Sequence, residues 1–356
     1  MRSEEDRIAE QQIGDYPLGR MVDLMLGGGR CHFLPNSTPD EQSCREDDRN
    51  IISEAKEKFG WSYVGDRAGF DSLQLGKNVT LPLLGLFART DIPYEIDRKD
   101  KDYPALWEMA EAALTALSEA TKDSDKGFFL MVEGSRIDHA GHANDPAAQV
   151  REVLAYDKTF QSIVEWVEKS DVQGVVVSTS DHETGGLAAA RRMSTHQILH
   201  TLADFIVAEL RESYPDYLWY PGVLDNATHS AEFLSAQLAA FSESDDKKLD
   251  KYIRKKILVE GLGVLDASDD EVRRLKQSRA GASYIIADIV SRRAQIGWST
   301  FTCFLFYSDF SLTKGKNSHT RTLWCRRQYL RYRCRNPPFT RKPRKYRNWR
   351  LHQRLP

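Results

Sequence analysis

Several features that would assign this chain to a common class are missing from its sequence. No stretch reaches 18 consecutive apolar residues, so no ordinary transmembrane helix is expected. The first residues, MRSEEDRIAEQ, contain no apolar segment of a secretory signal, and as written the chain has no means of entering a secretory route. The five cysteines form no CxxC pair, which excludes a disulfide scaffold and a cysteine-rich zinc module.

Acidic residues are missing from one end of the chain. Residues 314–356 contain 15 Lys and Arg and no Asp or Glu, which leaves 35 basic against 52 acidic residues elsewhere. An acidic body with a wholly basic tail indicates two different kinds of sequence. With 41% hydrophobic residues, the body is long and apolar enough for one large α/β domain with insertions.

The most informative stretch is GFFLMVEGSRIDHAGH, residues 127–142. Its apolar run, residues 128–132, is short enough to suit a strand that is buried on both faces. The run ends on Glu133, and Asp138 and His142 follow at spacings of five and four. A carboxylate oxygen and an imidazole nitrogen are a common ligand pair for zinc.

A second stretch repeats this design. GVVVSTS, residues 174–180, predicts another buried strand, and it leads into Asp181 and His182. A helical pattern over about 146–169 connects the two, so the strands should be parallel and both loops should emerge at one sheet edge. We therefore expect Glu133, Asp138, His142, Asp181 and His182 in one pocket. A single Asp–His pair is more often a solvated loop or a cap, but two on adjacent strands favour a metal site.

The remaining pattern predicts the fold class. Expected helices over 4–13, 47–59 and 104–121 alternate with expected strands at 21–26, 61–64 and 81–87, which is typical of a doubly wound, mainly parallel α/β sheet flanked by helices. A helical insertion is expected over about 190–280, with helices at 195–212, 229–242, 246–259, 268–278 and 283–296. Gly27–Gly29 lacks a nucleotide-binding signature and is interpreted as a tight turn rather than a phosphate cradle. His196, His200 and His229 are interpreted as surface or half-buried histidines.

VEGSRIDHAGH and STSDHETGG resemble the two central motifs of the alkaline phosphatases. LMLGGGRCHFLP, GWSYVGDRAGFDSL and RRAQIGWST resemble further segments of that family, most closely its fungal vacuolar type. The resemblance covers about residues 8–300. It implies hydrolysis of phosphate monoesters through a phosphoserine, with two zinc ions and one magnesium ion. By the same resemblance Asp138 and His142 bind the first zinc, Asp181 and His182 the second, and Glu133 magnesium.

Two acids and one histidine near these motifs are left with alternative roles or with none. Glu133 has the alternative of orienting a ligand from outside the metal shell, Glu183 either orients a ligand or faces solvent, and His139 is not assigned. A two-metal site suits the chemistry, because phosphoryl transfer needs in-line positioning and charge stabilisation of the attacking and leaving oxygens.

The chain also departs from the family pattern. The family's nucleophile motif, its remaining magnesium ligands and its phosphate-binding arginine precede the segment matched by Ile8, so no catalytic residue is assigned and low activity is expected. Where the family continues with His-Gly-His after Gly297–Thr300, this chain has Phe301, Thr302 and Cys303. We expect 301–356 to be a basic tail that is either disordered or translated in the wrong frame. Residues 319–331 can be encoded by codons that, when read one base later, begin with Thr-His-Gly-His. That alternative reading resembles the absent motif.

Other functions remain as alternatives. They are a non-catalytic relative that binds metal or phosphoesters, a related phosphodiesterase or phosphomutase, and a nucleic-acid binder using the arginines and tyrosines of the tail. Under the main interpretation the expected substrates are small phosphate monoesters, and the resemblance implies a homodimer. No nucleic-acid partner is expected.

Cellular location is predicted only indirectly. The resemblance implies a vacuolar or secretory lumen, and three N-glycosylation acceptors begin at Asn36, Asn78 and Asn226. Cys31 and Cys44 either form a disulfide in such a compartment or remain free thiols.

Overall fold

The computed structural model describes residues 4–39, 43–182, 187–189, 219–243 and 245–298. Contacts within the chain divide it into Met1–Thr302 and Cys303–Pro356, and all described residues belong to the first unit. The expected helix over 195–212, His196, His200, Glu183 and the basic tail over 301–356 lie outside the described residues. None of the described helices is both long and apolar enough to cross a membrane.

A three-stranded parallel sheet forms in the first part of the chain. Its strands are β1 (Leu24–Gly27), β2 (Ser62–Val64) and β3 (Leu83–Leu86), in the order β1-β3-β2. Leu83 is level with Leu24 on one side and with Ser62 on the other. All four residues of β3 are buried, as expected of a central strand covered on both faces.

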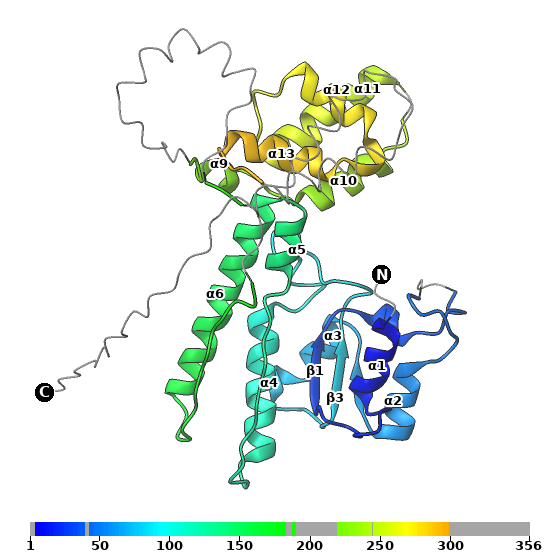
Figure 1. Ribbon diagram of the computed structural model, residues 1–356, viewed down its shortest axis with the longest axis vertical. Helices are drawn as coiled ribbons and strands as arrows, with labels where there is room; N and C mark the ends of the chain where they lie inside the picture. The colour runs from blue at the N-terminus through cyan, green and yellow to red at the C-terminus, as the bar shows by residue number, and fades with distance from the viewer. Residues whose placement is uncertain (1–3, 40–42, 183–186, 190–218, 244, 299–356) are drawn as a thin grey trace, which may run out of the picture. The chain divides into compact units, whose positions relative to one another are not determined.

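Helices cover both faces of this sheet (Figure 1). On one face, Leu84 and Leu86 pack with residues of α1 (Glu5–Ile13) and α2 (Ile51–Phe59). On the other, Leu83 packs with residues of α3 (Arg67–Ser72) and α4 (Leu106–Thr121). Because successive side chains of a strand point to opposite faces, Leu83 and Leu84 serve different layers. The predicted doubly wound sheet flanked by helices is confirmed.

Three glycines, Gly27–Gly29, lie at the end of β1 and in the turn that follows it. A Cβ on Gly28 would lie 2.1 Å from the carbonyl oxygen of Thr90, so only glycine fits there. The N–H of Gly29, whose φ is +85°, donates to the same oxygen at 2.6 Å, and a 3₁₀ turn over Arg30–Phe33 follows. The N–H groups of Arg30 and Cys31 donate to Ala88 and Arg89. These donors are occupied within the fold, which agrees with a tight turn rather than a phosphate cradle.

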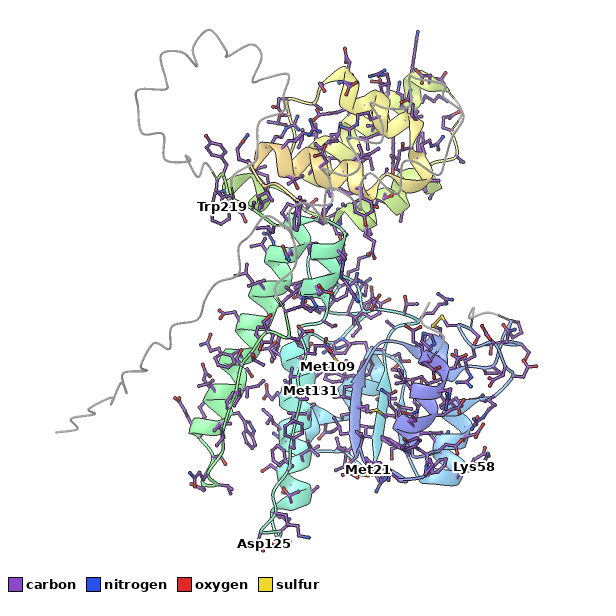
Figure 2. All side chains as sticks on the ribbon, viewed as in Figure 1. Met21, Lys58, Met109, Asp125, Met131 and Trp219 are labelled. Carbon is purple, nitrogen blue, oxygen red and sulfur yellow. A yellow bond between two sulfur atoms is a disulfide. The ribbon has the colours of Figure 1, made fainter. Side chains whose placement is uncertain are left out.

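The predicted buried strands at 128–132 and 174–180 are wrong for this structure. Neither segment is a strand, and Phe129, Met131, Val175 and Val177 are largely exposed. Met131 is one of the side chains labelled in Figure 2. An apolar run forms a buried strand only where neighbouring strands pair with it, and among the described residues α6 lies against these segments but no strand pairs with them.

The chain continues as a predominantly helical region. α5 (Arg136–His142) precedes α6 (Pro146–Glu168), which agrees with the helix predicted over 146–169. The later helices are α9 (Gly222–Asp225), α10 (Ala231–Ala240), α11 (Asp246–Tyr252), a π-helix (Ile253–Gly261), α12 (Asp269–Gln277) and α13 (Ser283–Arg293). Short 3₁₀ turns occur at Gln74–Gly76 and Arg279–Gly281. Leu234, Leu238, Ile257, Leu275 and Ile286 form part of a separate apolar core in this region.

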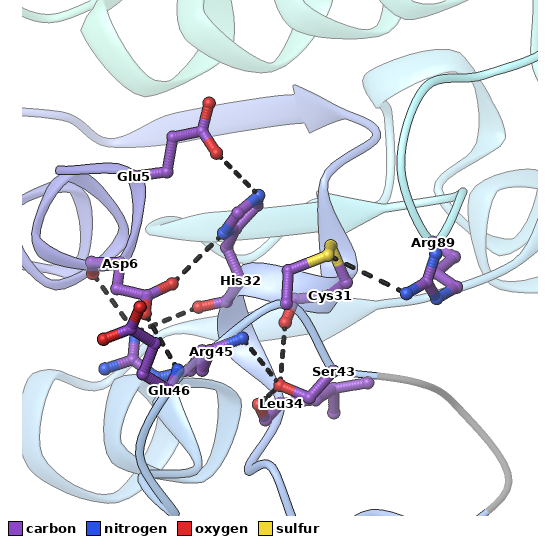
Figure 3. The surroundings of a disulfide bond; sticks show 10 residues. Glu5, Asp6, Cys31, His32, Leu34, Ser43, Arg45, Glu46 and Arg89 are labelled. Carbon is purple, nitrogen blue, oxygen red and sulfur yellow. Dashed lines mark hydrogen bonds and ion pairs between the residues drawn. A yellow bond between two sulfur atoms is a disulfide. The ribbon is translucent and has the colours of Figure 1, made fainter. Parts of the chain in front are cut away.

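Cys31 and Cys44 form a disulfide, so the open question about their state is answered for this structure. Figure 3 shows the polar groups around it. The fully buried Arg45 side chain donates to Glu10 at 2.9 Å and to Asp47 at 2.7 Å. His32 lies 3.2 Å from an Asp6 oxygen. These contacts attach the disulfide-closed loop to α1.

Candidate metal centre

Helix α5 presents Asp138 and His142 on one face. The two residues are one helical turn apart, and His142 Nε2 lies 3.2 Å from Asp138 Oδ2. His142 is mostly exposed, whereas the Asp138 side chain is partly covered. The carboxylate and imidazole therefore meet at the surface, on a helix where the sequence analysis expected a loop.

One oxygen of Asp138 has no partner in the structure. Oδ1 is shielded from solvent and accepts no hydrogen bond. A shielded carboxylate oxygen without a donor costs free energy, and a bound cation would remove that cost. A carboxylate oxygen beside an imidazole nitrogen also suits zinc chemically. The Asp138–His142 pair therefore fits a metal ion as part of a larger ligand set.

The position of α5 is set by contacts outside the pair. The guanidinium of Arg136 stacks on the buried Tyr94 ring at 3.6 Å and lies 3.4 Å from carboxylate oxygens of Asp91 and Glu232. At the other end of α5, the Tyr284 hydroxyl donates to the His142 carbonyl at 3.2 Å. Together these contacts connect the candidate ligands to both the loop after β3 and the later helical region.

The second predicted pair is also close together. His182 Nε2 lies 3.6 Å from Asp181 Oδ2, and both side chains are more than half exposed. Glu133 is exposed as well. In the first segment, Phe128 contacts Trp166 near the end of α6, and Gly134 lies against Tyr156 nearer its start. In the second segment, Gly174 lies against Val167, and the Ser178 hydroxyl forms a hydrogen bond with the Tyr156 hydroxyl. Both segments thus run from the carboxyl-terminal part of α6 towards its amino-terminal part, in the same direction.

The structure does not gather the five predicted ligands into one compact site. In the described part of the chain, only Cys31, His32 and Cys44 bring three potential ligand atoms within 4.8 Å of one another. Their sulfurs are joined in the disulfide, so this group is not a metal site. The grouping of Glu133 and the two Asp–His pairs in one pocket stays a prediction.

Sequence analysis did not single out two buried acids that lie at or in helix α6, next to α5. The Asp145 carboxylate accepts from the N–H groups of Ala147 and Ala148 at the start of α6, and from Ala231 N–H at 2.6 Å. It therefore connects α6 to α10, and burial raises its pKa despite these bonds. The Asp-Pro at the start of a helical pattern was the available signal, since Asp before a first-turn proline is a helix-start signature.

The second missed acid is Glu152 on α6. Its carboxylate accepts from the Glu95 N–H at 2.6 Å, and burial raises its pKa to about 7. Nothing in the local sequence distinguishes it from a solvated helix residue. Among the predicted bystanders, His229 is half-buried, bonds to Asp97 at 3.0 Å and stacks on Phe233. That environment agrees with its interpretation as a half-buried histidine.

Comparison with known proteins gives a consistent set of relatives. A family profile described as alkaline phosphatase matches residues 1–300. The chain is 50% identical over 314 residues to the repressible alkaline phosphatase of Saccharomyces cerevisiae, covering 84% of this chain and 52% of that protein. It is 41% identical over 300 residues to an alkaline phosphatase of Schizosaccharomyces pombe, covering 83% and 51% respectively. The chain thus spans about half the length of these relatives.

A solved structure shows the same fold. A cold-active alkaline phosphatase from a psychrophilic Shewanella superposes with a TM-score of 0.58 at 24% identity, over 83% of this chain and 59% of that one. At that identity the likeness supports the architecture of the sheet and its flanking helices.

Proposed function

Because this chain belongs to the alkaline phosphatase family, we propose that it serves metal-dependent hydrolysis of phosphate monoesters. In this proposal Asp138 and His142 hold one zinc ion, Asp181 and His182 hold a second, and Glu133 holds magnesium. The observation that carries it is the shielded, unpartnered Oδ1 of Asp138 beside the His142 imidazole.

The ligand types match the proposed ions. Zinc takes carboxylate oxygen and imidazole nitrogen together, whereas magnesium prefers carboxylate oxygen, as Glu133 supplies. Bound divalent cations would stabilise the negative charge of a transferring phosphoryl group. The chain's own contribution is to fix α5 through Arg136 and Tyr284, which holds Asp138 and His142 at the surface where a small anionic substrate has access.

Further aspects of the proposal concern location and assembly. The Cys31–Cys44 disulfide and exposed acceptor asparagines at 36, 78 and 226 support a vacuolar or secretory lumen, where disulfides persist. We propose a homodimer on family resemblance alone. No nucleic-acid partner is proposed.

Metal content tests the assignment. After loading with zinc and dialysis, the wild-type chain should retain zinc, although weakly, because each pair supplies two ligands. Asp138→Ala with His142→Ala, and Asp181→Ala with His182→Ala, should each retain less. His139→Ala, on the same helix as the first pair, is the matched control and should retain the wild-type amount. Equal zinc in all four proteins would refute the ligand assignment.

Hydrolysis of an aryl phosphate tests the activity separately. The family assignment predicts that any phosphatase turnover by this chain falls by orders of magnitude in Asp138→Ala, since metal ligands act in the transition state. Turnover that Asp138→Ala leaves unchanged would contradict the proposed role. Turnover of a phosphodiester in place of the monoester would favour the phosphodiesterase alternative.

A further inference from the structure

An open hollow in the helical region has an almost entirely apolar lining, although most of its residues are lysines. Its volume is about 240 Å³, and its walls are Phe241, Lys248, Lys251, Tyr252, Lys255 and Lys256. Lysine gives an apolar wall when its methylene stem lies along a surface and its ammonium group reaches into water. The hollow therefore combines an apolar interior with a cationic rim, and none of the proposed metal ligands belongs to it.

Two stacked rings supply the aromatic part of the hollow. Phe241 directly follows α10, and Tyr252 is the last residue of α11. Their ring centroids lie 4.1 Å apart, with the ring planes 17° from parallel, and both side chains pack against the apolar core of the helical region. The guanidinium of Arg279 lies 5.9 Å from the centroid of the Phe241 ring. Tertiary packing thus holds this ring pair in place, and it offers the hollow a surface on which a further planar ring can stack.

The helix that carries the lysines has one face in the core. Leu249, Ile253 and Ile257 recur every four residues and are buried, while the lysines of the hollow are exposed. The change from α11 to the π-helix falls between Tyr252 and Ile253, in the middle of the residues that line the hollow. π-Helical turns are rare and occur frequently at functional sites. The backbone at the hollow is therefore of a kind that often accompanies binding.

Two of the four lysines have no anionic partner. Lys248 and Lys256 each form an ion pair with a glutamate, at 2.8 Å and 2.6 Å. In the part of the chain that the structure describes, the ammonium groups of Lys251 and Lys255 form no ion pair and no hydrogen bond. Lysine binds phosphate as a point charge. Two unpaired ammonium groups at the rim of an apolar hollow therefore favour a ligand that joins phosphate to an apolar ring.

We propose that this hollow binds a nucleoside diphosphate, with the base against the ring pair and the phosphates at Lys251 and Lys255. A nucleotide uses both parts of the hollow, because every base has a π-face that stacks on an aromatic side chain and its phosphates need cations. An inorganic phosphate chain would leave the apolar interior empty. The volume lies below the range of about 300–1,000 Å³ for drug-sized ligands and suits a single base. This site goes beyond the proposed hydrolysis, since it contains none of the proposed metal ligands.

Binding of ADP to the full 356-residue chain tests the site. Isothermal titration calorimetry in EDTA measures it, because EDTA removes the metal ions that would hold or hydrolyse ADP at the proposed metal centre. ADP should bind, and adenosine and pyrophosphate should each bind at least about tenfold more weakly, since each lacks one half of the ligand. Lys251→Ala with Lys255→Ala should weaken ADP binding by more than about tenfold. Tyr252→Leu should weaken it by at least about fivefold, because it removes stacking and keeps an apolar side chain.

A charge-matched control separates this site from general attraction of anions. Lys101→Ala with Lys247→Ala removes the same charge from exposed lysines outside the hollow, and it should bind ADP like wild type. Photolabelling with 8-azido-ADP gives the position of the ligand directly. The label should attach within residues 241–256 and not within the basic residues 314–356.

Four results would overturn the proposal. They are absence of ADP binding, pyrophosphate binding as tight as that of ADP, equal ADP affinity in all the variants, and label confined to residues 314–356. A single-stranded oligonucleotide that binds through the same lysines more tightly than ADP would also overturn it, in favour of a nucleic-acid surface. Should circular dichroism show Tyr252→Leu unfolded, the exposed lysine pair decides alone. The assay contains no metal, so its failure leaves the zinc assignment to its own test.

Discussion

Replacing Glu152 with Gln should stabilise the protein at high pH and leave its stability at low pH unchanged. The Glu152 carboxylate is largely buried on α6 and accepts a hydrogen bond from Glu95 N–H. Gln keeps an acceptor oxygen for this bond but carries no charge. The substitution therefore isolates the free-energy cost of ionising a buried carboxyl.

The sign follows from proton linkage. Burial raises the Glu152 pKa from 4.5 to about 7. Between these values the unfolded chain has lost the proton and the folded chain still holds it, so the free energy of unfolding falls as pH rises through this window. Above about pH 7 the loss is complete. A shift of this size corresponds to at most about 3 kcal/mol, reduced by whatever solvent reaches the group.

Urea denaturation at pH 4 and pH 8 measures this difference, because pH 4 lies below both pKa values. The variant and the wild type should be similarly stable at pH 4, and the variant should be more stable by about 1–3 kcal/mol at pH 8. An equal difference at both pH values would mean that packing, not ionisation, is responsible. A variant less stable than wild type at pH 8 would refute the reasoning.

Substitutions at three further places test particular contacts through the free energy of unfolding. Asp145→Ala should lower the free energy of unfolding by about 3 kcal/mol, because it removes an acceptor shared by three backbone N–H groups. Asp145→Asn should lower it less, because the amide oxygen keeps the helix cap, and equal losses in the two variants would contradict this. Gly28→Ala should cost about 1–3 kcal/mol because its Cβ meets a carbonyl oxygen, whereas the control Gly27→Ala meets nothing within 4 Å and should be nearly neutral. Cys31→Ser with Cys44→Ser should cost about 3 kcal/mol and remove the effect of reductant on stability, and a wild type insensitive to reductant would argue against the disulfide.

Local patterns were enough to predict most of the described helices and the sheet. Leu83–Leu86 is an apolar run between turn residues and becomes β3, and the period of Met109, Ala110 and Ala113 predicts the buried face of α4. Such patterns depend on residues close in sequence. The state of 128–132 could not be predicted in the same way, because a strand also needs a lateral partner and apolar composition does not supply one.

For the candidate site, the ligand residue types were predictable from the sequence, whereas the helix that carries Asp138 and His142, expected as a loop, and its distant support were not. The i, i+4 relation of Asp138 and His142 follows from helical geometry. The contacts that fix their helix come from Tyr94 and Tyr284, which are remote in sequence and have no local pattern. Glu152 likewise acquires its raised pKa from tertiary burial alone.

X-ray absorption at the zinc edge tests the central claim most directly. The chain loaded with one equivalent of zinc should show a first shell of nitrogen and oxygen only, with an imidazole contribution that decreases in His142→Ala. The wild-type spectrum should be reproduced by His32→Ala, because His32 belongs to the group beside the disulfide and not to the proposed centre. A shell containing sulfur, or one that His142→Ala leaves unchanged, would contradict the account.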